Sequence, residues 1–282
     1  MTLRNRWRKI LSYVMLSLTG VCAVAAVSIL FLILGILVYN GWQSVDWNFF
    51  TRLPKSPGET GGGMVNAIVG SAEIIALATL AGLPVGFMAG VYLSEFGGKT
   101  YSFLIRYMAD LLNGVPSIVV GIFAYAVLVV PMHGDSALAG GFALAVMLIP
   151  ITARSTEQFM SSVPKTLREG ALALGASKWK TIATVVVPAA YRGIATGMIL
   201  GVARIAGETA PLLFTSGSND YMSSGFRQPT ASLPVMIYLR ALAPYEDWHR
   251  QAWAAGLVLL FLVLFANVAA RLILSRGIAV QK

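Results

Sequence analysis

Long apolar runs separated by short polar stretches follow one another along the whole chain. The runs cover roughly residues 12–38, 64–93, 116–130, 137–153, 191–214 and 251–274. The longer ones hold about 20 residues or more, which at ~1.5 Å per residue is enough to cross ~30 Å of hydrocarbon. The third run begins at Pro116, a residue tolerated near a helix start because its missing N–H has no partner there. The pattern predicts an all-α integral membrane protein with six transmembrane helices.

The first apolar run follows a basic stretch, Arg4 to Lys9, as the apolar region of a signal peptide does. A signal peptide has only ~7–15 apolar residues, and this run is about twice as long. Cys22 does not indicate a lipoprotein, because Val21 occupies the position where a small residue would precede the cleaved bond. The first run is therefore interpreted as an uncleaved span.

Composition supports a membrane protein and excludes several other classes. Hydrophobic residues make up 57% of the chain and charged residues 12%, about half the charged share of a soluble domain. The net charge of +9 does not indicate nucleic-acid binding, because no segment between the apolar runs is large enough to carry a folded basic surface. Cys22 is the single cysteine, and His133 and His249 have no neighbouring ligand residues, so neither a disulfide framework nor a metal site is predicted.

The distribution of lysine and arginine predicts the orientation, because cytoplasmic loops are enriched in both. An N-terminus inside the cell places most of the basic residues on the cytoplasmic side: Arg4, Arg6, Arg8, Lys9, Lys99, Arg106, Arg154, Lys165, Arg168, Lys178, Lys180, Arg192, Arg271, Arg276 and Lys282. The other side receives only Arg52, Lys55, Arg227, Arg240 and Arg250. Both termini are therefore expected in the cytoplasm, and residues 39–63 and 215–250 are expected to be outer loops of a protein in the bacterial inner membrane.

The cytoplasmic loop 154–190 contains a predicted short helix at about 165–177. Pro164 favours a helix start and Gly175 a helix end, and Leu167, Ala171 and Leu174 recur at helical spacing. A helix of this kind is expected to lie against a partner or against the membrane surface.

The spacing of this loop resembles the EAA signature of ABC importer permeases, which forms the cytoplasmic coupling helix. The matching residues are Glu169, Gly170, Ala171, Gly175, Val185, Val187 and Pro188. Gly170 replaces the central alanine, and the two valines replace isoleucine and leucine. The resemblance implies that Glu169, Gly170, Ala171 and Gly175 contact a separate ATPase.

The chain carries no nucleotide site of its own. Gly98-Lys99-Thr100 matches the end of a phosphate-binding loop, but Leu93 stands where the earlier glycine is required. We therefore expect no cofactor in this chain and no enzymatic activity, with ATP and Mg bound by a partner.

The fifth apolar run contains two charges, Arg204 and Glu208. Arg204 comes 12 residues after Arg192, which is ~18 Å along a helix and places it near the middle of the membrane. Glu208 follows four residues later and is expected on the same helical face. Charges at this depth are costly and mark a transport pathway by default. A self-satisfying structural ion pair is the alternative.

The stretch R-x-x-G-E-T-A-P-L-L-F-T, which begins at Arg204, is similar to the PstA permeases of bacterial phosphate-specific ABC transporters, a branch of the type I, MetI-like importer permeases. Three further segments carry the resemblance, A-G-V-Y-L-S-E-F (89–96), P-S-I-V-V-G (116–121) and L-R-E-G-A-L-A-L-G (167–175). The resemblance implies three kinds of protein partner besides lipid: a homologous PstC-like permease, a PstB-like ATPase homodimer and an external PstS-like phosphate-binding protein. Phosphate would cross by alternating access.

This resemblance covers about 61–271 and implies three parts of the chain. Residues 1–63 would hold the cytoplasmic tail, first span and outer loop, residues 64–275 the permease core, and residues 276–282 a second tail. A permease for sulfate or molybdate and a non-transporting membrane signalling subunit remain as alternatives. A membrane enzyme is disfavoured, since no nucleophile–base pair or metal constellation is visible.

Four other features are left open by the sequence. Glu73 lies within the second span and is equally compatible with a structural role and with a place on the pathway. Lys99 and Arg106, in the predicted loop 94–110, are interpreted as topology determinants. In the outer loop, Ser232 and Pro234 favour a helix start, and residues 235–243 are expected to form an interfacial helix against the binding protein.

Overall fold

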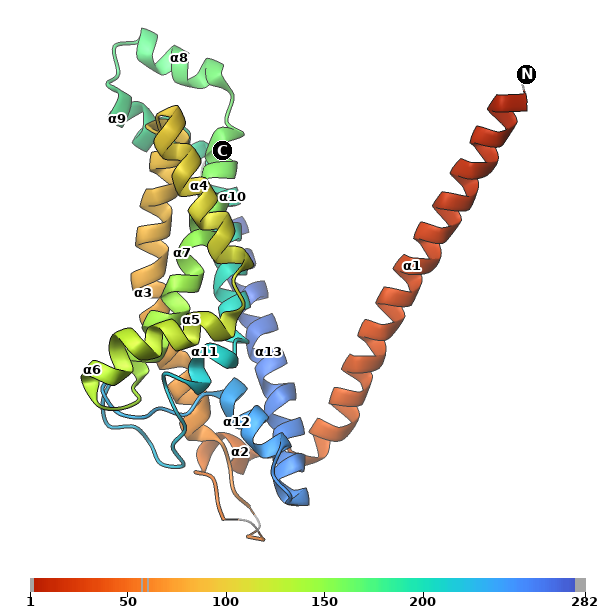
Figure 1. Cartoon of the computed structure of the whole chain (residues 1–282), viewed down its shortest axis with the longest axis vertical. Helices are drawn as coiled ribbons and strands as arrows, with labels where there is room; N and C mark the ends of the chain where they lie inside the picture. Colours follow the sequence, from red (N-terminus) through yellow and green to blue (C-terminus); the bar gives the residue numbers. More distant parts are fainter. Residues whose placement is uncertain (1–2, 57, 60, 277–282) are drawn as a thin grey trace.

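The computed structural model describes residues 3–56, 58–59 and 61–276, and every regular element in these ranges is a helix (Figure 1). Five helical segments in this part are long and apolar enough to cross a membrane, and the number rises to six when a bent pair of helices is counted as one span. The long helices are α1 (Leu3–Gly41), α3 (Val65–Glu95), α7 (Ala137–Ser161), α10 (Val187–Ala206) and α13 (Glu246–Arg276). The prediction of an all-α membrane bundle with six crossings is confirmed.

The third crossing differs from its prediction. The apolar run at 116–130 does not cross alone: α5 (Ser117–Ala124), the π-helical η2 (Tyr125–Val129) and α6 (Val130–Met132) turn by 102° from the helix before them. That preceding helix, α4 (Lys99–Gly114), occupies residues expected in a cytoplasmic loop and runs along α7 (Figure 1). The bend lies at Val115 and Pro116, both with extended backbone, because a residue before proline avoids the helical region.

Three other span limits were also predicted inaccurately. α7 continues through Pro150 to Ser161 instead of ending near residue 153. The fifth crossing begins earlier than residue 191, with α9 (Lys178–Thr181) and the π-helical η3 (Ile182–Val186) leading into α10. It ends at Ala206, and α11 (Ala210–Leu213) is a separate short helix.

The centre of the bundle is α7, packed between α3 and α10. Glycines on both neighbours allow the close approach, as small residues do between membrane helices. A Cβ atom at Gly86 would lie 2.7 Å from the Thr152 side chain, and one at Gly90 would lie 2.5 Å from the Thr156 side chain. On the other side of α7, Gly197 lies against Ser155. These contacts fix the positions of the three helices relative to one another along their axes.

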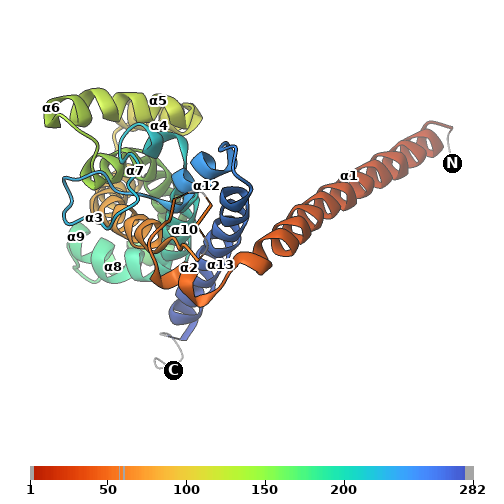
Figure 2. The same cartoon turned by 90° about the horizontal axis from the view of Figure 1, so that it is seen from below.

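The first helix, α1, joins the bundle at its C-terminal end and projects away from it (Figure 1, Figure 2). At the junction, a Cβ atom on Gly41 would lie 2.8 Å from the carbonyl oxygen of Trp253 in α13. None of the most apolar window of α1 is buried within the chain.

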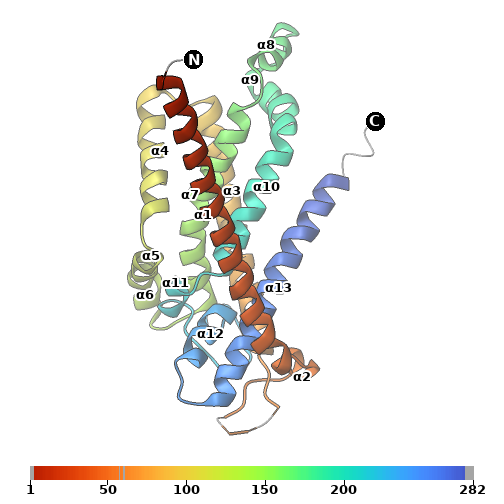
Figure 3. The same ribbon diagram turned by 90° about the vertical axis from the view of Figure 1, so that its right-hand side faces the viewer.

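The two ends of the molecule carry different short helices. α8 (Lys165–Ala173) and α9 lie at one end, and α2 (Trp47–Thr51) and α12 (Leu233–Ala241) lie at the other (Figure 3). The start of α1 and the end of α13 both lie on the α8 side (Figure 3), as an even number of crossings requires. The assignment of that side to the cytoplasm stays a prediction.

The predicted outer helix is present as α12, but its first residues are buried in the bundle instead of lying on its surface. Leu233, Val235 and Met236 are at most 2% exposed. Arg240 is also buried: it contacts Gln251, lies 3.8 Å from Asp220 and sits over the ring of Trp248. Burial lowers the pKa of Arg240, and the negative charge of Asp220 partly offsets this effect. α12 is therefore fastened to α13 by a buried cation as well as by apolar packing.

Candidate substrate pathway and coupling site

Arg204 lies in the last turn of α10 with its side chain exposed on this single chain. α10 runs antiparallel to α7, since a Cβ atom at Gly193 would meet Phe159 and one at Gly201 would meet Leu148. Leu148 is about midway along α7, and Arg204 comes less than one turn after Gly201. The backbone of Arg204 is therefore level with the middle of the central spanning helix.

Glu208 does not share a helical face with Arg204, so that prediction is wrong. α10 ends at Ala206, and Gly207 and Glu208 continue in a turn closed by a backbone hydrogen bond from Glu208 to Ile205. The break precedes Pro211, which cannot continue the hydrogen-bond ladder of the preceding turn. In residues 61–276 the structure shows no ion pair between Arg204 and Glu208, so the self-satisfying pair is not formed in this chain.

A second set of charges, missed by the sequence analysis, joins α4 to α7. The carboxylate of Glu157 on α7 accepts hydrogen bonds from Arg106 of α4 at 2.5 Å and from Arg154 of its own helix at 2.8 Å. Arg154 also lies 3.0 Å from Asp110 of α4. Arg106 is therefore a helix-packing residue in addition to any role in topology.

This four-residue network lies on the α8 side of Arg204. Glu157 is the buried member, with 8% of its side chain exposed, whereas the side chains of both arginines are about two-fifths exposed. A cavity of about 300 Å³ adjoins it, lined by Arg154, Glu157, Gln158 and Ser161. The spacing of Arg106 with Asp110, and of Arg154 with Glu157, was the available sequence signal, because opposite charges at i,i+4 and i,i+3 share a helical face.

The predicted coupling helix is present as α8, ending earlier than residue 177. Pro164 precedes its first turn, and Gly175 adopts a positive φ of 83° just after its end. Backbone hydrogen bonds from Gly175 to Leu172 and from Ala176 to Ala171 close the helix. This C-terminal motif favours glycine because other residues are strained at positive φ.

The surface of α8 is largely open. None of its residues is buried, and Glu169 and Gly170 are exposed while Ala171 is half-buried. The side chains of Leu167 and Leu172 are each 48% exposed, and Leu174 is 90% exposed. Exposed leucines on and beside a helix at the end of the bundle are typical of a surface that a partner covers.

Glu73 and Lys99 are two more residues singled out by the sequence. Glu73 is half-buried on α3, and no ion pair to it is present in the part of the chain that the structure describes. The side chain of Lys99 lies outside the described residues.

Comparison with known proteins agrees with this arrangement. The family model for binding-protein-dependent transport system inner membrane components matches residues 82–277. The phosphate transport system permease protein PstA of Yersinia pestis is 41% identical over 97% of this chain and 93% of its own length. The probable phosphate transport system permease protein PstA of Methanocaldococcus jannaschii is 37% identical over 93% of both chains.

Solved structures share the fold at lower identity. A chain of the MetNI methionine ABC transporter in an inward-facing conformation has a TM-score of 0.61 and 18% identity, and the match covers 76% of this chain and 96% of that one. A bacterial ABC transporter that imports alginate gives a TM-score of 0.59 and 17% identity over 95% of this chain and 97% of that one. From the family model and the relatives together, the chain belongs to the binding-protein-dependent transport system inner membrane components and, among them, to the PstA permeases.

Proposed function

We propose that this chain is a permease subunit of an ATP-driven phosphate importer and that Arg204 meets phosphate as it crosses. The observation that carries the role of Arg204 is its position: a cation midway along the bundle, exposed on the single chain and without an ion-pair partner among the described residues. An unpaired charge at this depth costs several kcal/mol unless it faces water, a partner or a substrate. The sequence identity of this chain to permeases named for phosphate transport supports phosphate as the substrate.

The chemistry of a guanidinium suits this role. It stays protonated when water is removed, and its planar fork matches two oxygens of a phosphate. A wholly apolar passage would instead present the hydrated anion with a large desolvation cost. Arg204 therefore lowers the barrier without needing a cofactor.

The same proposal assigns the energy source to other subunits. A homologous permease would complete the pathway, and a separate ATPase dimer, which binds ATP and Mg, would dock on the exposed surface of α8 around Glu169. An external binding protein would deliver phosphate at the end that carries α2 and α12. Because a ligand shifts an equilibrium only through its differential affinity for two states, movement of α8 by the ATPase must change the environment of Arg204.

The test is uptake of labelled phosphate by cells that express the whole complex and lack other phosphate uptake systems. Arg204→Gln is expected to reduce uptake by more than about a hundredfold. Loss of a hydrogen bond to a charged group costs roughly 3 kcal/mol, which corresponds to a factor of this size. Arg204→Lys is expected to retain partial uptake because the charge remains. Assembly of each complex is measured by co-purification of the ATPase.

Two outcomes would contradict the proposal. Near-normal uptake by an assembled Arg204→Gln complex would remove Arg204 from the pathway. Uptake of labelled sulfate or molybdate by the wild-type complex, without uptake of labelled phosphate, would identify a different oxyanion as the substrate. Arg271, exposed on α13, supplies the matched control, since Arg271→Gln removes the same charge far from the middle of the bundle.

A further inference from the structure

Arg168 of α8 makes contacts that the sequence did not indicate. Its Nη2 atom lies 2.9 Å from the carboxylate of Glu95, the last residue of α3. Nη1 donates to the carbonyl oxygen of Val163 at 2.6 Å, and Nη2 donates to that of Met160 at 2.7 Å. One guanidinium therefore binds the end of α3 and the end of α7 at once.

The physical reason for this convergence is the negative electrostatic potential at the ends of both helices. The last carbonyl groups of a helix have no partners within it, and they carry the negative end of the helix dipole. Glu95 adds a full negative charge at the same place. A planar guanidinium has enough donors to satisfy a carboxylate and two carbonyls together, whereas a lysine ammonium lacks this fork geometry.

The contact is shielded from water, although α8 itself is exposed. Only 8% of the Glu95 side chain and 19% of the Arg168 side chain are accessible. In the described part of the chain, Arg168 is the residue of α8 whose side chain hydrogen-bonds to the bundle. The ion pair is therefore better protected than surface pairs, which contribute little.

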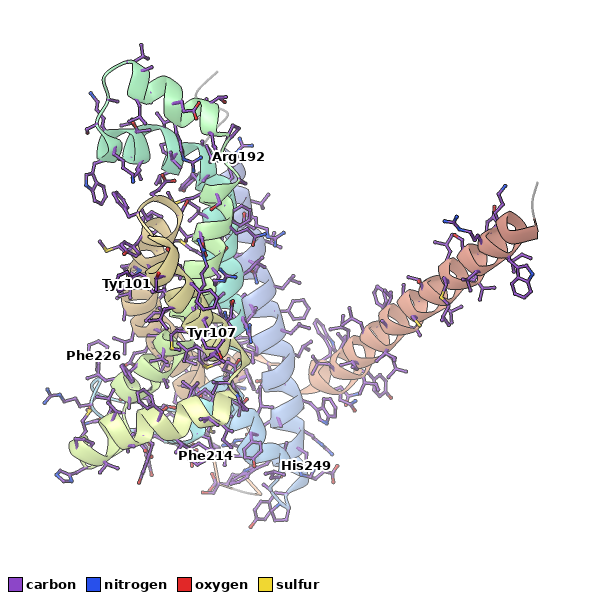
Figure 4. All side chains as sticks on the ribbon, turned by 45° about the horizontal axis from the view of Figure 1, so that its top comes forward. Tyr101, Tyr107, Arg192, Phe214, Phe226 and His249 are labelled. Atoms are coloured by element: carbon purple, nitrogen blue, oxygen red, sulfur yellow. The ribbon has the colours of Figure 1, made fainter. Side chains whose placement is uncertain are left out.

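The segment after α8 holds the same end of α3 by different contacts. The Lys178 ammonium donates to the backbone carbonyl of Glu95 at 2.6 Å and lies 4.3 Å from the centre of the Phe96 ring. The rings of Phe96 and Trp179 are 4.8 Å apart. α8 and α9 thus both contact the C-terminal end of α3, at the end of the molecule marked by Arg192 in Figure 4.

The connection matters because α3 and α8 are not consecutive in the chain. The chain joins α8 directly to α7 on one side and, through α9 and η3, to α10 on the other. A push on α8 reaches α7 and α10 through the backbone, but it reaches the end of α3 through Arg168 and through α9. α3 then carries the movement along α7, against which it packs at Gly86 and Gly90.

We infer that Glu95 and Arg168 form the joint through which movement of α8 is passed to α3, so that ATP hydrolysis is coupled to rearrangement of the pathway. This inference rests on the proposed function, and it names both residues as positioning residues that do not touch the substrate. Without the joint, α8 would still dock on the ATPase, but α3 would follow it less closely, through the contacts of α9 alone.

The experiment uses the complete complex reconstituted in vesicles with its binding protein, and it compares Glu95→Gln, Arg168→Gln, the double variant and Arg168→Lys. Three quantities are measured: co-purification of the ATPase, ATP hydrolysis stimulated by the binding protein, and phosphate import. Each single Gln variant is expected to assemble and hydrolyse ATP but to consume about five to ten times more ATP per phosphate imported. This factor is at the low end of the range typical of coupling between two sites in a protein. Arg168→Lys is expected to lie between Arg168→Gln and the wild type.

Arg192→Gln is the matched control, because Arg192 is an exposed arginine at the same end of the molecule but outside α8, and its loss should leave the stoichiometry unchanged. The double variant should be no worse than either single variant, since both remove one interaction. Additive losses, or a wild-type stoichiometry in Glu95→Gln, would overturn the inference. So would failure of Glu95→Gln to assemble, because Glu95 lies outside α8 and the pair would then be only architectural. Failure of the proposed function is distinguishable, since the wild-type complex would then import no phosphate.

Discussion

Arg154 on α7 lies 3.0 Å from Asp110 on α4, and this contact holds together two helices whose charged residues are 44 positions apart in the chain. Arg154 also binds Glu157 at 2.8 Å, and Glu157 in turn accepts from Arg106. Each arginine has an acidic partner on the opposite helix, and Glu157 serves both. Charges that would be expensive in a membrane helix are thereby neutralised in pairs.

Replacing Glu157 with Gln should destabilise the packing of α4 on α7. The variant leaves Arg106 and Arg154 around a neutral amide, and loss of a charged hydrogen-bond acceptor typically costs about 2 kcal/mol. We expect a lower melting temperature for the purified complex. Asp110→Asn should have a smaller effect, because 56% of the Asp110 side chain is exposed. Equal stability of the Glu157→Gln variant and the wild type would contradict the structural role of the network.

The same network explains why the third crossing was predicted incorrectly. Arg106 and Asp110 interrupt the apolar pattern of residues 99–114, so this segment resembles a loop when hydropathy alone is considered. Their partners come from α7, and no local pattern identifies them. The other crossings were predictable because each contains one long apolar segment. Only such a segment is stable as a helix in the hydrocarbon of the bilayer, so hydropathy identifies it.

Gly90 should tolerate no side chain. A Cβ atom there would lie 2.5 Å from Thr156 and 2.6 Å from the carbonyl oxygen of Ala153, so α3 and α7 must separate to accommodate it. Overpacking of this kind costs about 1–3 kcal/mol. Gly90→Val is expected to lower the yield of assembled complex and its melting temperature, whereas Gly98→Ala, with nothing within 4 Å of the added Cβ atom, should match the wild type. An unchanged Gly90→Val complex would mean that the helices are not in close contact.

Substitution of two glycines in and beside α8 should have different effects on transport. Gly175 has a φ of +83°, which valine cannot adopt without strain, whereas Gly170 lies inside α8 with open space around its Cβ position. Gly175→Val should distort the end of α8 and reduce both uptake and ATP hydrolysis stimulated by the binding protein, while the chain still inserts in the membrane. Gly170→Ala should leave both activities unchanged, because alanine favours the helix. Normal stimulation in Gly175→Val would remove α8 from the coupling role.

The coupling helix was predictable because its signals are local. Pro164 and Gly175 mark its ends by their backbone preferences, and the apolar spacing between them is helical. The contact between Arg168 and Glu95 spans 73 residues of sequence, and neither residue differs in pattern from an ordinary surface charge. The sequence therefore located the helix but not its attachment to α3.

Thiol labelling in sealed cells tests the orientation. Cys22 is the single cysteine of the chain, so Cys22→Ser provides a background without thiols. Lys165 begins α8 and Ser218 hydrogen-bonds to Met236 of α12, so Ser218→Cys and Lys165→Cys place exposed thiols at the opposite ends of the molecule that carry these helices. An impermeant reagent added outside should label position 218 only, and position 165 should react once the cells are opened. Labelling of position 165 in sealed cells would reverse the predicted orientation.

The end of α10 between Arg204 and Glu208 leads to a prediction that differs from the one expected for a continuous helix. A continuous helix would place the two charges on one face, and their removal would then be coupled. In the structure α10 ends at Ala206, and no ion pair joins the two residues in the described chain.

A double-mutant cycle measures this coupling. Uptake is compared in Arg204→Lys, which retains activity to measure, Glu208→Gln and the double variant, each corrected for the amount of assembled complex. Independent residues should give additive effects within about 0.5 kcal/mol, whereas a direct ion pair would give an interaction energy of about 0.5–3 kcal/mol. We expect additivity, with Glu208→Gln acting on the turn at Gly207 instead of on the charge of Arg204. A large interaction energy would contradict the separation of Arg204 from Glu208 that the structure shows.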